Sequence, residues 1–183
     1  MNRLGLVLVL AIFLVAHGAV GAGEIHEAVK AQKLVKLAEI VAKDAGQVNA
    51  LDQEGWSPLG LAVLAEDLKT TKFLLDKKAD VNIKDADGFA PLHWAVIKGN
   101  KKVIGLLIKY NADVNITEKD GITPLITAVG ESQLDVVKYL LSKGAAINHV
   151  ITNGELKGQT ALKLAEKGKL TAIVSFLKSQ GAR

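Results

Sequence analysis

The sequence predicts an all-α repeat solenoid, in which stacked helix-turn-helix repeats are joined by β-turn or hairpin fingers. Three long segments align with one another without a gap, and equivalent residues in them are 33 positions apart. Each segment also holds two short runs of apolar residues at helical spacing, separated by a polar or glycine break. A single segment of this kind cannot bury its own apolar face, so the segments are expected to stack on one another.

The recurring columns of the repeat predict each element in turn. A glycine permits the positive φ of a tight turn, and a proline at the first helical position gives up only a hydrogen bond that the start of a helix lacks anyway. The columns are Gly55, Gly88 and Gly121, then Pro58, Pro91 and Pro124, and, after the second helix, Asn82, Asn115 and Asn148. Each repeat is therefore expected to be a β-turn, a pair of antiparallel helices, and an extended segment that leads to the next turn.

The residues that open the first helix of each repeat carry a family resemblance. They read "SPLGLA" from Ser57, "APLHWA" from Ala90 and "TPLITA" from Thr123. This pattern resembles the ankyrin repeat, whose signature is T-P-L-H-x-A. The resemblance covers residues 23–183. It implies an N-terminal capping repeat at 23–51, ankyrin repeats at 52–84, 85–117 and 118–150, and a C-terminal repeat at 151–183.

The last repeat departs from the regular spacing. Gly121 and Gly158 are 37 rather than 33 residues apart, so four residues are inserted before the helices of the C-terminal repeat. The insertion contains Asn153-Gly154 between β-prone residues, which is a strong signal for a two-residue hairpin turn. We expect a longer finger here, which either extends a partner surface or shields the edge of the last repeat.

Residues 1–22 have the features of a cleaved secretory signal. Arg3 supplies a positive start, residues 4–16 are an unbroken apolar run, and Val20 and Ala22 are placed for cleavage after Ala22. The apolar run is 13 residues long and falls short of the roughly 20 that span a bilayer, although a retained membrane anchor is the alternative. The mature protein is then expected in the bacterial periplasm or outside the cell, and not at the membrane.

The residue pattern lacks the usual signs of catalysis, so the sequence predicts no enzyme activity and no cofactor. Glu54, Asp87 and Asp120 recur at the same spacing on the predicted turn tips, where solvated carboxylates are favoured over a metal site. The chain has no cysteine, which excludes a thiolate metal site and leaves packing alone to hold the fold. The net charge is +4, but with only two arginines among 183 residues the composition is not typical of nucleic-acid binding.

His93 and Trp94 stand out because aromatic residues make up only 4% of the chain. For His93 the resemblance implies a structural role, a hydrogen bond across to the backbone of the neighbouring repeat, and a buried polar side chain needs such a partner. Trp94 is expected on the row of first helices, where it is either packed or partly exposed to a binding partner.

The residue after each turn glycine is large and apolar: Trp56, Phe89 and Ile122. In a stack of repeats these residues form one row near the turn tips, and Leu64, Ile97 and Lys98 on the first helices face the same concave side. Ankyrin proteins usually bind partners with such positions, and an apolar stripe with a polar rim is typical of a protein-binding surface. The alternative is that the row only stiffens the stack.

The sequence thus predicts an exported, monomeric and non-enzymatic ankyrin-repeat protein. Its expected function is a protein–protein interaction through the concave face and the turn tips. The alternative is a membrane-tethered or stress-linked scaffold without a discrete binding hot spot. Function in a repeat fold depends on the surface residues rather than on the fold itself, so the partner stays unnamed at this point.

Overall fold

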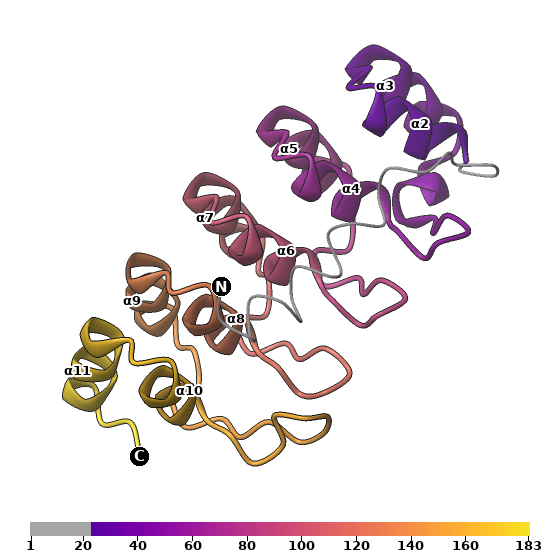
Figure 1. Ribbon diagram of the computed structural model, residues 1–183. Helices are drawn as coiled ribbons and strands as arrows, with labels where there is room; N and C mark the ends of the chain where they lie inside the picture. Colours follow the sequence, from indigo (N-terminus) through magenta and orange to yellow (C-terminus); the bar gives the residue numbers. More distant parts are fainter. Residues whose placement is uncertain (1–22) are drawn as a thin grey trace. The chain divides into compact units, whose positions relative to one another are not determined.

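The computed structural model of the protein describes residues 23–183, and the signal segment predicted at residues 1–22 lies outside them. The described residues form ten α-helices, one short 3-10 helix and an isolated β-bridge between Val150 and Thr160 (Figure 1). They fall into two compact units, residues 23–113 and residues 114–183, each of which is described by itself. No helix among residues 23–183 is long and apolar enough to cross a membrane.

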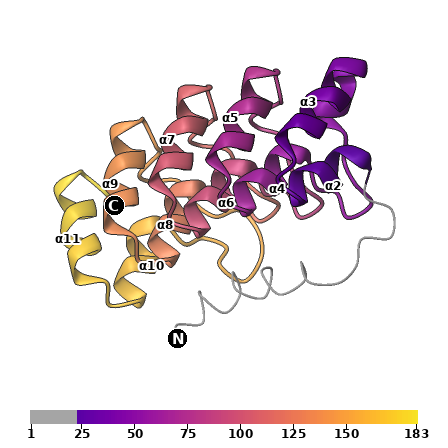
Figure 2. The same cartoon turned by 90° about the horizontal axis from the view of Figure 1, so that it is seen from above.

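The first unit, residues 23–113, contains three helix pairs. The pairs are α2 (Glu24–Lys30) with α3 (Leu34–Lys43), α4 (Pro58–Leu64) with α5 (Leu68–Asp76), and α6 (Pro91–Ile97) with α7 (Lys101–Lys109); the 3-10 helix η1 (Ala45–Asn49) follows α3. Helix α4 packs against both α2 and α6, and α5 packs against α7. The first helices of the pairs thus lie in one row and the second helices in another (Figure 2).

The second unit, residues 114–183, contains two further helix pairs. They are α8 (Pro124–Gly130) with α9 (Leu134–Ser142), and α10 (Ala161–Lys167) with α11 (Thr171–Ser179). Helix α10 packs against α8, and α11 packs against α9. The predicted all-α repeat solenoid is confirmed for the described residues, because helix pairs stack on helix pairs within each unit.

The residue before each first helix of the repeats determines where that helix begins. The hydroxyl of Ser57 accepts the backbone N–H of Gly60 at 3.0 Å, which satisfies one of the free N–H groups at the start of α4. Thr123 and Thr160 cap α8 and α10 in the same way. At α6 the capping residue is Ala90, which has no side-chain acceptor, and its own N–H donates to Nδ1 of His93 at 3.2 Å. The N–H of His93, which a cap hydroxyl would accept elsewhere, donates instead to the carbonyl of Ala90 at 2.9 Å.

Leucines on both rows of helices form the core of the first unit. Leu59 and Leu92 on the first helices, and Leu74 and Leu107 on the second helices, are at most 1% exposed. Burying one such side chain contributes roughly 1.5–3 kcal/mol to stability. Because these side chains are covered by neighbouring helices, a helix pair is stable only in the stack.

An asparagine at the end of each repeat binds the next repeat in the same unit. In the first unit, Oδ1 of Asn49 accepts the backbone N–H of Asp80 at 2.8 Å, and Oδ1 of Asn82 accepts that of Asp113 at 2.9 Å. The second unit has the same bond from Ala146 to Asn115 and from Arg183 to Asn148. The asparagine column of the sequence is explained by these four asparagine links, which join successive repeats side by side.

The first finger (residues 52–56) and the second finger (residues 85–89) lie against each other. Gly55 in the first finger has a φ of 82°, and a Cβ atom added there would lie 2.8 Å from Cβ of Ala86 and 3.0 Å from its backbone nitrogen. A larger residue would therefore be strained both by its own backbone and by the neighbouring finger. The residues that follow the two turn glycines, Trp56 and Phe89, are thus carried by fingers that touch each other.

The long finger before α10 does not form the two-residue hairpin predicted at Asn153-Gly154. The turn is closed instead by the N–H of Gly158, which donates to the carbonyl of Ile151 at 2.9 Å. The backbone N–H of Asn153 donates to the carbonyl of Asp120, in the preceding finger, at 2.9 Å. The prediction is wrong because this contact with the neighbouring repeat competes with the local turn that an Asn-Gly pair favours on its own.

Candidate functional site

A carboxylate at the start of each of the first three fingers holds the backbone of that finger. In the second finger, Oδ1 of Asp85 accepts the N–H groups of Asp87 and Phe89 at 3.0 and 2.9 Å. The equivalent pairs of bonds are made by Asp52 in the first finger and by Glu118 in the third finger, residues 118–122. The residue after the turn glycine is therefore presented on a backbone that a carboxylate fixes.

These three carboxylates lie two positions before the acidic residues that the sequence spacing predicts on the turn tips. Of those tip residues, Glu54 and Asp87 are exposed and Asp120 is half-buried. The carboxylates that bind the backbone, Asp52, Asp85 and Glu118, also recur every 33 residues. An acidic residue three positions before a turn glycine is the signal that would have identified them, because its side chain reaches two N–H groups of the turn.

Three aromatic side chains, Trp56, Phe89 and Trp94, form an aromatic cluster in the first unit. The ring of Trp94 contacts those of Trp56 and Phe89, with centroid distances of 5.2 and 5.1 Å and interplanar angles of 47° and 38°. Pairs of this kind contribute about 0.5–1.5 kcal/mol each beyond the burial of area. Trp94 is 2% exposed, whereas Trp56 and Phe89 are half-buried. The cluster thus has a buried centre on α6 and two rings that reach the surface from adjacent fingers.

A shallow surface hollow lies beside the aromatic cluster. Its lining consists of the three rings with Ser57, Gly60, Ile83, Asp85 and Pro91. A Cβ atom at Gly60 would lie 3.2 Å from the hydroxyl of Ser57, which caps α4, and 3.4 Å from Cε3 of the Trp56 ring. The hollow encloses no space of its own, so a partner group would lie against it rather than inside it.

Asp85 connects the second finger to the aromatic cluster. Its Oδ2 accepts the indole N–H of Trp94 at 2.8 Å. Burial raises the pKa of Asp85 above its ordinary value, while hydrogen bonds from Trp94, Phe89 and Asp87 oppose that rise. The folded protein therefore holds a proton on Asp85 more tightly than the unfolded chain does. The folded protein therefore loses stability as the pH rises through the raised pKa of Asp85, because the buried carboxyl then gives up its proton.

The indole N–H of Trp94 should report the titration of Asp85. We expect its proton resonance to move with pH with a midpoint above 3.8, the ordinary pKa of an aspartic acid, because burial disfavours the carboxylate. A two-dimensional NMR titration from acidic to neutral pH measures the midpoint, with the indole of Trp56 as the internal control. A midpoint at or below 3.8 would show that the hydrogen bonds outweigh burial.

A family model described as ankyrin repeats (3 copies) matches the chain twice, over residues 25–118 and over residues 106–183. The chain belongs to the ankyrin-repeat family. A comparison with curated proteins finds no match. Ankyrin repeats commonly mediate protein–protein interactions and are generally non-enzymatic binding scaffolds. Within residues 23–183, no three histidine or acidic side chains gather in a way that could hold a metal ion.

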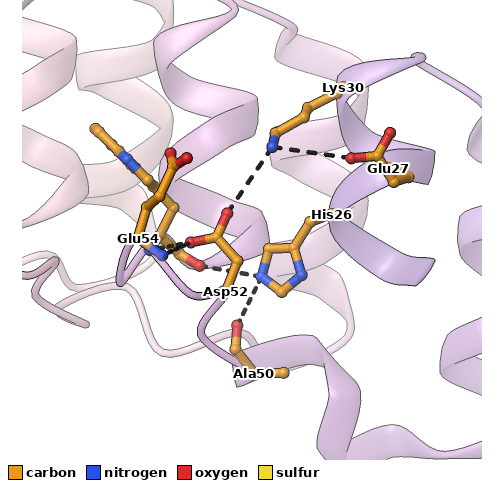
Figure 3. Close-up of polar contacts among 7 residues, drawn as sticks. His26, Glu27, Lys30, Ala50, Asp52 and Glu54 are labelled. Carbon is orange, nitrogen blue, oxygen red and sulfur yellow. Dashed lines mark hydrogen bonds and ion pairs between the residues drawn. The ribbon is translucent and has the colours of Figure 1, made fainter. Parts of the chain in front are cut away.

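The ankyrin histidine position is used in two of the repeats. His93 is fully buried and accepts the N–H of Ala90 in its own repeat, while its bond to a neighbouring repeat stays a prediction. His26 is the third residue of α2, just as His93 is the third residue of α6. It is 1% exposed and makes a hydrogen bond between repeats (Figure 3). Its Nε2 donates to the carbonyl oxygens of Ala50 and Trp56, each 3.0 Å away. His26 therefore attaches α2 to the first finger, which precedes α4.

Lys30 adds a charged contact at the same junction (Figure 3). Its Nζ lies 3.9 Å from a carboxylate oxygen of Glu27 and 3.9 Å from one of Asp52. The side chain of Asp52 is only 2% exposed, so its charge is balanced by Lys30 and by the finger N–H groups that it accepts. The first finger is thus fixed from α2 as well as from within.

The structure separates the predicted binding residues of this ankyrin protein into two groups. Trp56 and Phe89 are brought together by adjacent fingers and keep part of their surface. Leu64, Lys98 and Ile122 are also half-buried, with Ile122 in the second unit. Trp94 and Ile97 are only 2% and 9% exposed, so their prediction as partner contacts is corrected to packing positions. The reason is that all seven residues of α6 are buried, which leaves this helix without an exposed face.

Proposed function

We propose that this ankyrin-repeat protein is exported and binds a protein partner through its concave face and turn tips, without enzymatic activity of its own. The observation that carries the proposal is the pair of half-exposed rings, Trp56 and Phe89, on adjacent fingers. Large aromatic residues are the commonest hot spots of protein interfaces. Both rings rest on buried Trp94, so little conformational entropy is lost when a partner covers them. Leu64 and Lys98 add an apolar and a charged contact.

Removing both half-buried rings tests the binding site. We expect Trp56→Ala combined with Phe89→Ala to reduce capture of the partner at least tenfold, because each hot-spot ring contributes about 2 kcal/mol. The immobilised protein is exposed to an extract of its native compartment, and captured proteins are compared by mass spectrometry. Phe73→Ala is the matched control, because it removes a half-buried ring from α5 rather than from a finger. Undiminished capture by the double variant, with its helical circular dichroism retained, would contradict the site.

The export part of the proposal has a separate test. The charged start and apolar run of residues 1–22 support cleavage after Ala22, which makes Gly23 the first residue of the mature protein. N-terminal sequencing of protein isolated from its native cells identifies that residue, and light scattering of the mature protein is expected to give a monomer. Recovery of residues 1–22 in a membrane fraction would instead favour the membrane-tethered scaffold.

A further inference from the structure

The two fingers that carry the aromatic cluster are acidic, although the chain as a whole has a net charge of +4. Residues 52–56 read DQEGW and residues 85–89 read DADGF, so the two fingers hold four acidic residues and no basic one. The rest of residues 23–113 holds 13 lysines against nine acidic residues. Negative charge is therefore concentrated at the fingers, while the helices of the same unit are basic.

The four acidic side chains of these fingers have two different roles. Asp52 and Asp85 bind the backbone N–H groups of their own fingers and face inward. Glu54 and Asp87 are exposed, and within the described part of the chain no hydrogen bond or ion pair engages their carboxylates. Each of the two precedes a half-buried ring of the cluster by two residues. Their charges are therefore available to a partner that covers the rings.

The aromatic rings favour a cation that also has a flat apolar body. A guanidinium or ammonium group over such a ring contributes roughly 0.5–1 kcal/mol at an exposed site and more when it is desolvated. An arginine side chain is planar, stacks on aromatic faces and can fork toward carboxylates. The shallow hollow beside the cluster is lined by the rings and by Asp85, so a guanidinium group would lie against this surface rather than enter a pocket. Burial raises the pKa of Asp85, and a nearby cation would offset the cost of its charge.

We propose that the partner contacts the first two fingers with a basic segment, which places an arginine side chain against the aromatic cluster with Glu54 and Asp87 as its counter-ions. The inference rests on the proposed function and adds the chemistry of the partner. The net charge of the chain alone would favour an acidic partner. The negative charge of the two fingers instead determines which partner is favoured at this site, because screening limits interactions between exposed charges to about 10 Å at 0.1 M salt.

Tryptophan fluorescence observes this surface directly, because the chain has two tryptophans and both belong to the aromatic cluster. The probe is a short capped peptide of alternating glycine and arginine. We expect it to change the emission of the full mature protein saturably at low salt, and we expect a peptide with glutamate in place of arginine to leave the emission unchanged. A response to the glutamate peptide, or to neither peptide, would overturn the proposal.

Charge-neutral variants test the two counter-ions. Glu54→Gln combined with Asp87→Asn should weaken binding of the arginine peptide about fivefold, as expected for the loss of two exposed charge pairs. These substitutions preserve side-chain size and leave Asp52 and Asp85 in place. Glu155→Gln is the matched control, since it neutralises an exposed acid on the last finger, which has no aromatic residue, and should change the affinity less than twofold. Equal effects of the double variant and the control would overturn the assignment.

The same variants distinguish this inference from the proposed function. If the two ring deletions abolish capture of the partner while Glu54→Gln with Asp87→Asn does not weaken it, the fingers bind a protein but the basic-segment inference fails. If capture survives the loss of both rings, the proposed function itself fails. Loss of capture in both double variants supports the two proposals together.

Discussion

Replacement of Trp94 by alanine is expected to lower the free energy of unfolding by about 3–5 kcal/mol. The side chain is 2% exposed and contacts the rings of Trp56 and Phe89, so its loss leaves a cavity under both fingers. The substitution also removes the indole donor of Asp85. Urea unfolding followed by far-ultraviolet circular dichroism measures the loss without depending on tryptophan emission.

Two further variants separate the packing of Trp94 from its hydrogen bond. Trp94→Phe keeps most of the ring and removes the N–H group, so the expected loss is about 1–2 kcal/mol. Trp56→Ala removes a half-buried ring, and it should cost less than Trp94→Ala because water can occupy part of the space. If Trp94→Ala proved no more costly than Trp56→Ala, the cluster would not be centred on Trp94.

Replacement of Asp85 by alanine is expected to cost about 2 kcal/mol of unfolding free energy at neutral pH. The substitution leaves the backbone N–H groups of Asp87 and Phe89 and the indole N–H of Trp94 without their acceptor. Burial disfavours the charged form of Asp85, which raises its pKa, and the alanine variant no longer carries this desolvation cost. The net loss of unfolding free energy is therefore smaller than the three lost hydrogen bonds alone would give. Urea unfolding of both proteins at the same pH measures the difference.

Asp87→Ala is the matched control for this prediction, because it removes an exposed carboxylate from the same finger. A surface substitution of this kind is expected to change stability by no more than about 0.5 kcal/mol. Similar losses in the two variants would show that the finger does not depend on the carboxylate at its start. The comparison also tests whether the acid at the start of a finger, rather than the acid at its tip, stabilises the finger.

The repeat spacing was sufficient to predict the helix pairs and the turns between them. Helices α4, α6 and α8 begin at Pro58, Pro91 and Pro124, where the proline column places them. The role of His26 could not be predicted from that register, because 34 rather than 33 residues separate the first residues of α2 and α4. The predicted hairpin at Asn153-Gly154 is wrong for another reason. The turn preference of an Asn-Gly pair is local, whereas the hydrogen bond from Asn153 to Asp120 depends on the neighbouring finger.

The candidate site was only partly predictable. The pairing of Trp56 with Phe89 follows from the repeat itself, because equivalent residues of stacked repeats lie next to each other. The burial of Trp94 does not follow, since a seven-residue helix that is buried on all sides has no polar face to reveal its orientation. Whether its tryptophan reaches the surface depends on the two rings that cover it, one of which comes from the preceding repeat.

The asparagine links make neighbouring repeats open together. Asn49 and Asn82 each bind an amide of the following repeat, so a helix pair in the first unit cannot come loose without releasing the N–H of Asp80 or Asp113. Coupling between nearest neighbours makes a linear array melt in blocks rather than one repeat at a time. Each link adds one hydrogen bond to this coupling, but both bonds lie at the exposed surface, so the two amides also exchange their hydrogens when the asparagine side chain alone turns away.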